Sequence, residues 1–165
     1  MTVPPRQHET GEREYTSIAS HWPHRDSVLS AFRYLLAAPL LRGLRVLEVG
    51  CGSGEGALLA APAAARYACL DHHPWWTELG IPAPPNVSFI EADASALETL
   101  RLDPLDAVVA FELIEHLDSP SSFLASSLRL LKPSGFLLLS TPNFDLLSKR
   151  FDSSRRPLVP PQLHP

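Results

Sequence analysis

Apolar and polar residues alternate in blocks along the middle of the chain. Short apolar runs that stop at polar or glycine residues predict buried strands, and apolar residues three and four positions apart predict helices. We predict strands over 45–49, 66–70, 87–94, 105–111 and 136–139, a helix after the glycines that follow the first strand, further helices over 25–38 and 120–131, and a short, proline-interrupted helix from about 75. Because strands alternate with helices and no hairpin turn is evident, the pattern indicates an α/β fold with a parallel sheet and helices on both faces.

The first predicted strand runs into four alternating glycines, Gly50, Gly52, Gly54 and Gly56. Glycine permits positive φ and lets a ligand approach the main chain without a Cβ in the way. The helix that follows offers unpaired N–H groups, which suit a carboxylate or a phosphate. The glycine spacing does not place G-x-G-x-x-G directly after the strand, which disfavours a nicotinamide-dependent dehydrogenase, and no Gly-Lys-Ser/Thr of a P-loop follows.

Acidic residues stand at the ends of the next two strands. Asp71 follows the second strand about 20 residues beyond the glycines, where a carboxylate can accept hydrogen bonds from ribose hydroxyls. Asp93 closes the third strand, where it can also cap the next helical turn, and the two roles are compatible. Because the carboxyl ends of parallel strands meet at one edge of the sheet, we expect the glycine turn, Asp71, Asp93 and Phe111 to line one crevice.

Composition narrows the classes of protein that fit. The 165 residues are 45% hydrophobic and 19% charged, which is enough apolar material for the core of one domain. A net charge of −4 gives no electrostatic reason to expect a nucleic-acid partner. The sequence has no apolar run of the roughly 18 residues that a membrane span needs, and its polar start does not resemble a signal peptide.

Cysteine usage and the flanking segments complete this outline. Cys51 and Cys69 form no disulfide framework, and we expect small buried residues in a reducing compartment, hence a cytoplasmic location. We divide the chain into a flexible start over 1–14, a binding domain over 15–147 and a tail rich in proline and arginine over 148–165.

Several motifs, taken together, resemble one family. They are E-V-G-C-G-S-G from Glu48, the acid at 71, F-E-L-I-E-H-L-D-S-P from Phe111 and R-L-L-K-P-S-G-F-L-L-L-S-T-P-N from Arg129. Their order resembles the class I methyltransferases that depend on S-adenosylmethionine (SAM), and in particular the subgroup with ubiquinone-pathway O-methyltransferases and bacterial small-molecule enzymes. The resemblance covers about 44–143. It implies a Rossmann-like parallel sheet, SAM as cofactor, and methyl transfer to a small-molecule acceptor, at oxygen.

The resemblance also implies roles for individual residues. In the family, the acid after the second strand holds the adenosine ribose, and the acid and main-chain N–H after the third strand meet the adenine. The cofactor-binding residues expected on this basis are Glu48, Gly50, Cys51, Gly52, Gly54, Asp71, His72, Asp93, Ala94 and Phe111. One of the tryptophans Trp75 and Trp76 is expected either to cover the adenine or to close the core.

Glu112 and His116 are the candidate catalytic residues. A histidine titrates in the range that suits a general base for a hydroxyl acceptor. Glu112, Glu115 and His116 are spaced i, i+3 and i+4, so a helical turn would place them on one face, where they could hold Mg²⁺ or Zn²⁺. E-x-x-E-H also resembles the metal site of small-RNA 3′-end methyltransferases. Our leading expectation is no metal, with these carboxylates in supporting roles.

In the resembling family, the chain continues beyond the fifth strand into an acceptor-site helix and two closing strands. This sequence stops at residue 165, so we expect the last two strands to be missing. An uncovered edge on the fifth strand would then need a second copy or a companion chain. The competing hypothesis for function is therefore a SAM-binding module that is non-catalytic or depends on a partner.

Overall fold

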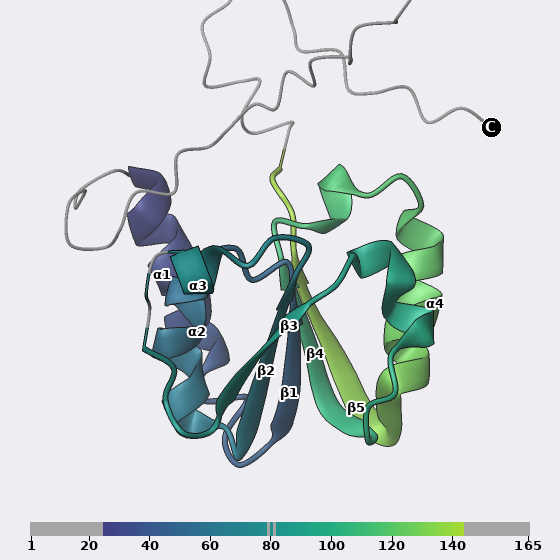
Figure 1. Ribbon diagram of the computed structural model, residues 1–165, viewed down its shortest axis with the longest axis horizontal. Coiled ribbons are helices and arrows are strands. Elements are labelled where there is room, and N and C mark those ends of the chain that lie inside the picture. Colours follow the sequence, from purple (N-terminus) through teal and green to yellow (C-terminus); the bar gives the residue numbers. More distant parts are fainter. Residues whose placement is uncertain (1–24, 79, 81, 144–165) are drawn as a thin grey trace, which may run out of the picture.

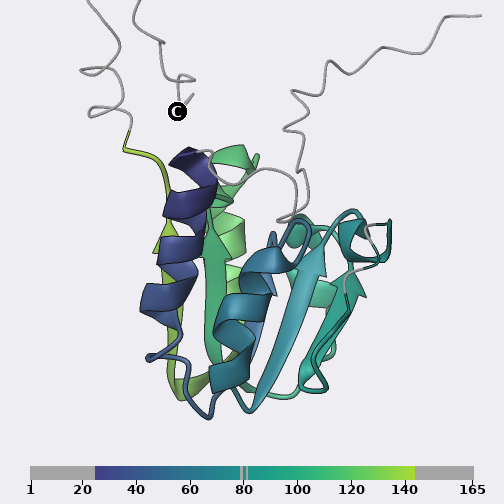
Figure 2. The same cartoon turned by 90° about the vertical axis from the view of Figure 1, so that its left-hand side faces the viewer.

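The computed structural model describes residues 25–78, 80 and 82–143, which form one parallel sheet with helices on both faces (Figures 1 and 2). The strand order is β3-β2-β1-β4-β5, and every neighbouring pair is parallel. The predicted Rossmann-like α/β architecture is confirmed. The strands are β1 (Arg45–Val49), β2 (Arg66–Asp71), β3 (Val87–Glu91), β4 (Leu105–Phe111) and β5 (Leu131–Ser140). The proposed flanking segments, 1–14 and 148–165, lie outside the described residues.

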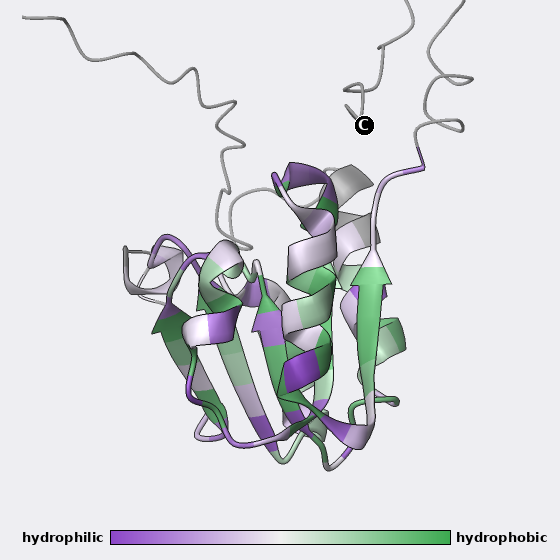
Figure 3. Ribbon diagram, turned by 90° about the vertical axis from the view of Figure 1, so that its right-hand side faces the viewer, coloured by the Kyte–Doolittle hydropathy of each residue, from purple (hydrophilic) through white to green (hydrophobic). Residues whose placement is uncertain are grey.

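Helices cover the sheet because side chains alternate along each strand and leave an apolar surface on both faces. Val46 and Tyr67 enter one core, and Leu47 and Leu70 enter the other. The first face carries α1 (Arg25–Ala37), α2 (Glu55–Ala60), η1 (Ala61–Ala63) and α3 (Trp75–Glu78), and the second carries η2 (Ala94–Thr99) and α4 (Pro120–Leu130), with η3 (Ile114–His116) above β4. In Figure 3, α4 lies in front of the apolar strands of the sheet.

Helix α1 matches the predicted helix over 25–38 to within one residue. Its inner face buries Tyr34 and Ala37 against the sheet. Its outer face is also apolar, because Phe32, Leu35 and Leu36 are each more than half exposed. Helix α3 has four residues, in agreement with the short helix predicted there.

Two strand boundaries were predicted wrongly. Strand β5 begins at Leu131 rather than at 136, because α4 ends at Leu130 and Leu131 pairs with Leu105 before an irregularity in the register. The residues Lys-Pro-Ser-Gly that follow resemble a helix stop, but tertiary pairing carries the strand through them. Strand β3 ends at Glu91 rather than at 94, since the next residues turn into η2.

The order of the strands reverses at the boundary between the neighbouring strands β1 and β4, which is the topological switch point of the sheet. From β1 the chain moves outward to β2 and β3, and it then crosses back to β4 and β5 on the other side. In open α/β sheets, ligands bind at the carboxyl ends of the strands next to such a switch point. These ends lie at the top of the sheet in Figure 1. Within the described part of the chain, every helix is too short or too polar to cross a membrane.

Candidate cofactor and acceptor site

The glycine turn joins β1 to α2 at the switch point. Gly50, Gly52 and Gly54 all have positive φ, of 76°, 55° and 79°. A Cβ at position 50 would lie 2.9 Å from Leu113 Cδ1, and one at position 54 would lie 2.8 Å from Phe89 Cε1. Glycine is therefore required here both by the backbone conformation and by the space that its neighbours leave.

Asp71, at the end of β2, is fixed directly against this turn. Its Oδ2 accepts a hydrogen bond of 2.8 Å from the Gly52 N–H, and its Oδ1 accepts one of 3.3 Å from the His73 N–H. His72 Nδ1 lies 3.0 Å from Oδ1 of the same carboxylate, although the His72 side chain is largely exposed. The structure thus brings the predicted acid and the predicted glycine turn together.

Asp93 and Ala94 follow β3 on the same edge of the sheet. Asp93 caps η2 by accepting a hydrogen bond of 2.7 Å from the Ser95 N–H. Hydrogen bonds from Ser95 hold the pKa of Asp93 below its ordinary value. Ala94 opens η2, and none of the described residues accepts a hydrogen bond from its N–H. The capping role predicted for Asp93 is confirmed.

The two tryptophans differ in their surroundings. Trp76 is buried and stacks on Phe89, with ring centroids 4.6 Å apart and an interplanar angle of 8°. Trp75 is partly exposed and lies against His73, with centroids 4.1 Å apart. Because Phe89 also contacts Gly54, the Trp76 side chain closes the core beneath the glycine turn.

The carboxyl end of β4 carries Phe111 and Glu112. The Phe111 ring meets Tyr34 of α1 edge-on, with centroids 5.1 Å apart. Glu112 has a φ of 52°, which is rare for a residue with a side chain, and its N–H donates to Ser140 O at 3.0 Å. Glu112 Oε1 accepts a hydrogen bond of 2.8 Å from Ser140 Oγ and lies 3.3 Å from Arg33 Nη2.

Glu115 and His116 do not share a helical face with Glu112. The short helix η3 begins only at Ile114, after the left-handed residue Glu112, so the predicted single helical turn is wrong. Glu115 accepts a hydrogen bond of 3.2 Å from Thr141 Oγ1, while the His116 side chain is 62% exposed and its Nε2 lies 3.9 Å from Glu115 Oε1. Among the described residues, no three histidine, cysteine or carboxylate side chains gather as metal ligands.

Glu48 points into the core under α1. Its Oε1 accepts a hydrogen bond of 2.5 Å from the Tyr34 hydroxyl, and its Oε2 has no hydrogen-bond partner among the described residues. Burial raises the pKa of Glu48 to about 7. Cys51 is also buried, with its thiol 3.7 Å from Gly52 O, and the neighbouring Cys69 thiol and burial raise its pKa. Both cysteines are free.

Three residues that contact the predicted site residues were not predicted from the sequence. Arg33 and Tyr34 come from α1, far from the motifs, and Ser140 lies one residue beyond the predicted fifth strand. Each contacts a predicted site residue across a large sequence separation, which local patterns do not reveal.

Comparison with known proteins agrees with this geometry. The model of a family described as a methyltransferase domain matches residues 21–159. A probable S-adenosylmethionine-dependent methyltransferase of Mycolicibacterium smegmatis is 34% identical over 150 residues, which cover 90% of this chain and 56% of the relative. A ubiquinone biosynthesis O-methyltransferase of Xanthomonas oryzae is 29% identical, over 82% of this chain and 62% of the relative.

A solved structure shares the fold as well. The DhpI–SAM–HEP complex is 26% identical and superimposes with a TM-score of 0.60, over 84% of this chain and 65% of that chain. The present chain spans about half to three-fifths of the length of the curated relatives described above.

Proposed function

The chain belongs to the SAM-dependent methyltransferase family, and from this membership we propose that it transfers a methyl group from SAM to an oxygen atom of a small-molecule acceptor. Relatives named ubiquinone biosynthesis O-methyltransferase support the choice of oxygen. The exposed histidine beside the crevice supports it too, since a hydroxyl acceptor must lose its proton.

The contact between the glycine turn and Asp71 carries this proposal. Gly52 N lies 2.8 Å from Asp71 Oδ2. A ribose whose hydroxyls bind the Asp71 carboxylate would therefore lie next to the main chain of Gly52, where no Cβ stands in the way. The Ala94 N–H and the Asp93 carboxylate lie at the next strand end, where they suit a ring nitrogen and an amino group. These residues fit SAM, whose sulfonium supplies an already activated methyl group.

We assign different roles to the two candidate catalytic residues. His116 is exposed beside the strand ends and takes the proton from the acceptor hydroxyl, and its Nε2 lies 3.9 Å from Glu115 Oε1. Glu112 is a positioning residue, because its Oε1 is already shared by Ser140 and Arg33. Glu112 joins α1 to the ends of β4 and β5. These contacts hold in place the residues beside which an acceptor must be aligned.

Cofactor binding can be tested by calorimetry with SAM and S-adenosylhomocysteine. Asp71→Asn keeps the shape of the side chain but removes its charge, and we expect affinity to fall about ten-fold or more. Asp118→Asn is the matched control, because Asp118 is exposed and is not one of the residues to which a cofactor role is assigned. If the folded wild type binds no SAM, or binds NAD tightly instead, the proposed cofactor chemistry is wrong.

Transfer can be tested with a panel of small phenols, alcohols and amines. His116→Gln should lower kcat strongly without changing the affinity for SAM, because the acceptor hydroxyl then has no base to take its proton. Methylated amines without methylated hydroxyl compounds would contradict the oxygen target.

A second candidate is a SAM-binding module that depends on a partner for transfer. It is favoured by the edge of β5, since among the described residues β5 pairs only with β4. SAM binding without transfer to any acceptor, together with transfer once a companion chain is added, would establish this alternative.

We also propose that a second copy of the chain covers the edge of β5. In the described residues β5 pairs only with β4, and Phe136 and Leu139 are each about one-third exposed. Light scattering should then give twice the mass of 18.1 kDa, and a monomer at high concentration would contradict the proposal. The two free cysteines support a reducing, cytoplasmic location.

A further inference from the structure

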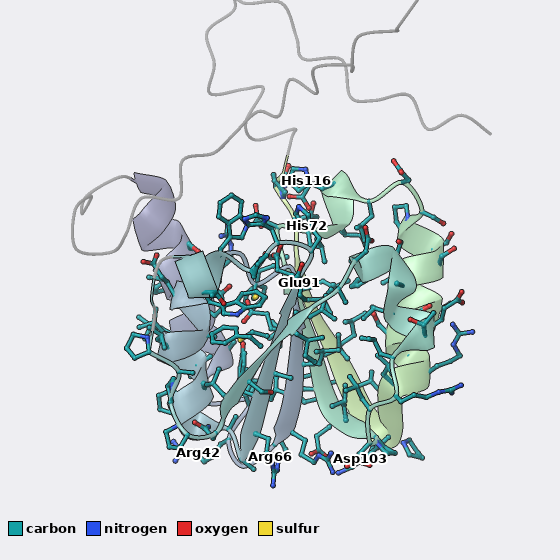
Figure 4. All side chains as sticks on the ribbon, viewed as in Figure 1. Arg42, Arg66, His72, Glu91, Asp103 and His116 are labelled. Atoms are coloured by element: carbon teal, nitrogen blue, oxygen red, sulfur yellow. The ribbon has the colours of Figure 1, made fainter. Side chains whose placement is uncertain are left out.

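A hollow of about 290 Å³ opens at the amino ends of the strands, at the opposite end of the sheet from the glycine turn and Asp71. Figure 4 shows Arg66 and Asp103 at this end, and His72 and His116 at the other. The hollow is lined by Arg45, Val46, Arg66, Ala68, Ser88, Arg101, Leu102, Asp103 and Leu105.

The connection between β3 and β4 explains why this space is open. In the described chain this connection holds only η2, a turn of six residues at the upper part of the sheet, in place of a full crossover helix. The lower parts of β2 and β3 are therefore left partly uncovered on the α4 side, and Ala68 and Ser88 form a floor. Residues 101–105 rise beside them as a wall.

The hollow is strongly basic, although the chain carries a net charge of −4. Arg45 and Arg66 are register partners on neighbouring strands, and Arg101 comes from the wall. Asp103 is the one acidic residue of the lining, and its Oδ2 lies 2.8 Å from Arg45 Nη2. With three guanidinium groups and one carboxylate, the lining has an excess of two positive charges.

We propose that this hollow binds the phosphate group of a small phosphorylated molecule. Guanidinium groups present paired N–H donors that match phosphate oxygens, and the Ser88 hydroxyl adds a further donor. The apolar side chains of Leu102 and Leu105 suit a short organic portion. The volume lies near the lower limit of small-molecule sites, which favours a compact ligand over an extended nucleic-acid strand.

Asp103 competes with such a ligand for Arg45. Its side chain is 77% exposed, so it can turn into solvent when phosphate takes over the guanidinium. Substitutions at the site should therefore change the affinity for phosphate in opposite directions. Removal of an arginine weakens phosphate binding, and removal of the Asp103 charge strengthens it.

The test is calorimetry of the full chain with inorganic phosphate and with glycerol 3-phosphate. We expect Arg66→Gln to weaken binding about ten-fold or more and Asp103→Asn to tighten it several-fold. Arg42→Gln is the matched control, because Arg42 is exposed at the same end of the molecule but does not line the hollow, and it should leave the affinity unchanged.

Tighter binding of the ester than of inorganic phosphate would support a phosphorylated metabolite and a role for the apolar wall. No binding by the wild type at millimolar phosphate would overturn the proposal, as would an Arg42→Gln effect equal to that of Arg66→Gln. Binding of single-stranded RNA without saturable phosphate binding would overturn it too. None of these results affects the proposed methyl transfer, because SAM binding is measured separately at the crevice.

Discussion

The carboxyl group of Glu48 is buried beneath the glycine turn and ionises near neutral pH. Burial raises its pKa from 4.5 to about 7, the hydrogen bond from Tyr34 opposes the shift, and the negative charge of Asp71 adds to it. In acid and up to about neutral pH, Glu48 is therefore largely protonated. It lies two residues before Gly50, so its charge state acts directly beneath the glycine turn.

Glu48 makes the free energy of unfolding depend on pH in a definite direction. Because its pKa is raised in the folded state, the stability that it contributes is complete below about pH 4.5 and is lost as the pH rises through about 7. We expect the wild type to lose about 2–3 kcal/mol more than Glu48→Gln between about pH 5 and pH 8. Urea unfolding at the two pH values measures this difference.

The control for this prediction is Glu91→Gln, which neutralises an exposed glutamate and should keep the pH dependence of the wild type. Hydrogen bonds hold the pKa values of Asp93 and Asp106 below their ordinary value, so these groups titrate beneath the window. Parallel pH dependences for the wild type and Glu48→Gln would show that Glu48 is not the group responsible.

Among the elements, α1 is attached to the sheet by two consecutive residues. Arg33 pairs with Glu112 at the end of β4, and Tyr34 donates to Glu48 of β1 while its ring meets Phe111. Helix α2 allows this approach, because a Cβ at Gly56 would lie 2.1 Å from Tyr34 Cζ. Helix α1, helix α2 and the carboxyl ends of β1 and β4 therefore pack together as one frame beside the glycine turn.

Gly56→Ala tests this frame. In an exposed helix, the substitution would stabilise by about 1 kcal/mol, but here we expect a net loss of about 1–3 kcal/mol because the methyl group displaces the Tyr34 ring. In a Tyr34→Ala background, the same substitution should become neutral or stabilising. Urea unfolding of the four proteins in this double-mutant cycle measures the coupling. Equal effects of Gly56→Ala in the two backgrounds would show that the ring does not set the position of α1.

These contacts also show where prediction from sequence ends. The glycine turn, Asp71 and the Asp93 cap are predictable because each depends on a strand end and a few adjacent residues. The conformation of Glu112 is not, because its positive φ goes with a hydrogen bond to Ser140, which is 28 positions away. The spacing of E-x-x-E-H suggested a continuous helical turn, and tertiary pairing of β4 and β5 overrides it.

At the scale of the whole molecule, the two proposed binding regions lie at opposite ends of the sheet. The predicted cofactor residues lie at the carboxyl ends of the strands, and the basic hollow lies at the amino ends. Strands of five to seven residues separate the two by about 20 Å. The crevice could be predicted from the topology of any such sheet, but the hollow could not, because it depends on the missing cover between β3 and β4.

This separation predicts that the two ligands stabilise the protein independently. A ligand that binds only the folded state at 100 times its Kd stabilises by about 2.7 kcal/mol, and one at 10 times its Kd by about 1.4 kcal/mol. We consider SAM at 100 times its Kd and glycerol 3-phosphate at 10 times its Kd. When both are present, the free energy of unfolding measured in urea should rise by the sum of the two contributions, about 4 kcal/mol. Asp71→Asn should remove only the SAM contribution, and Arg66→Gln only that of the phosphate ester. A combined value well below the sum would mean that the ligands share a site or oppose one another through the sheet, and the assignment of two separate ends would then be wrong.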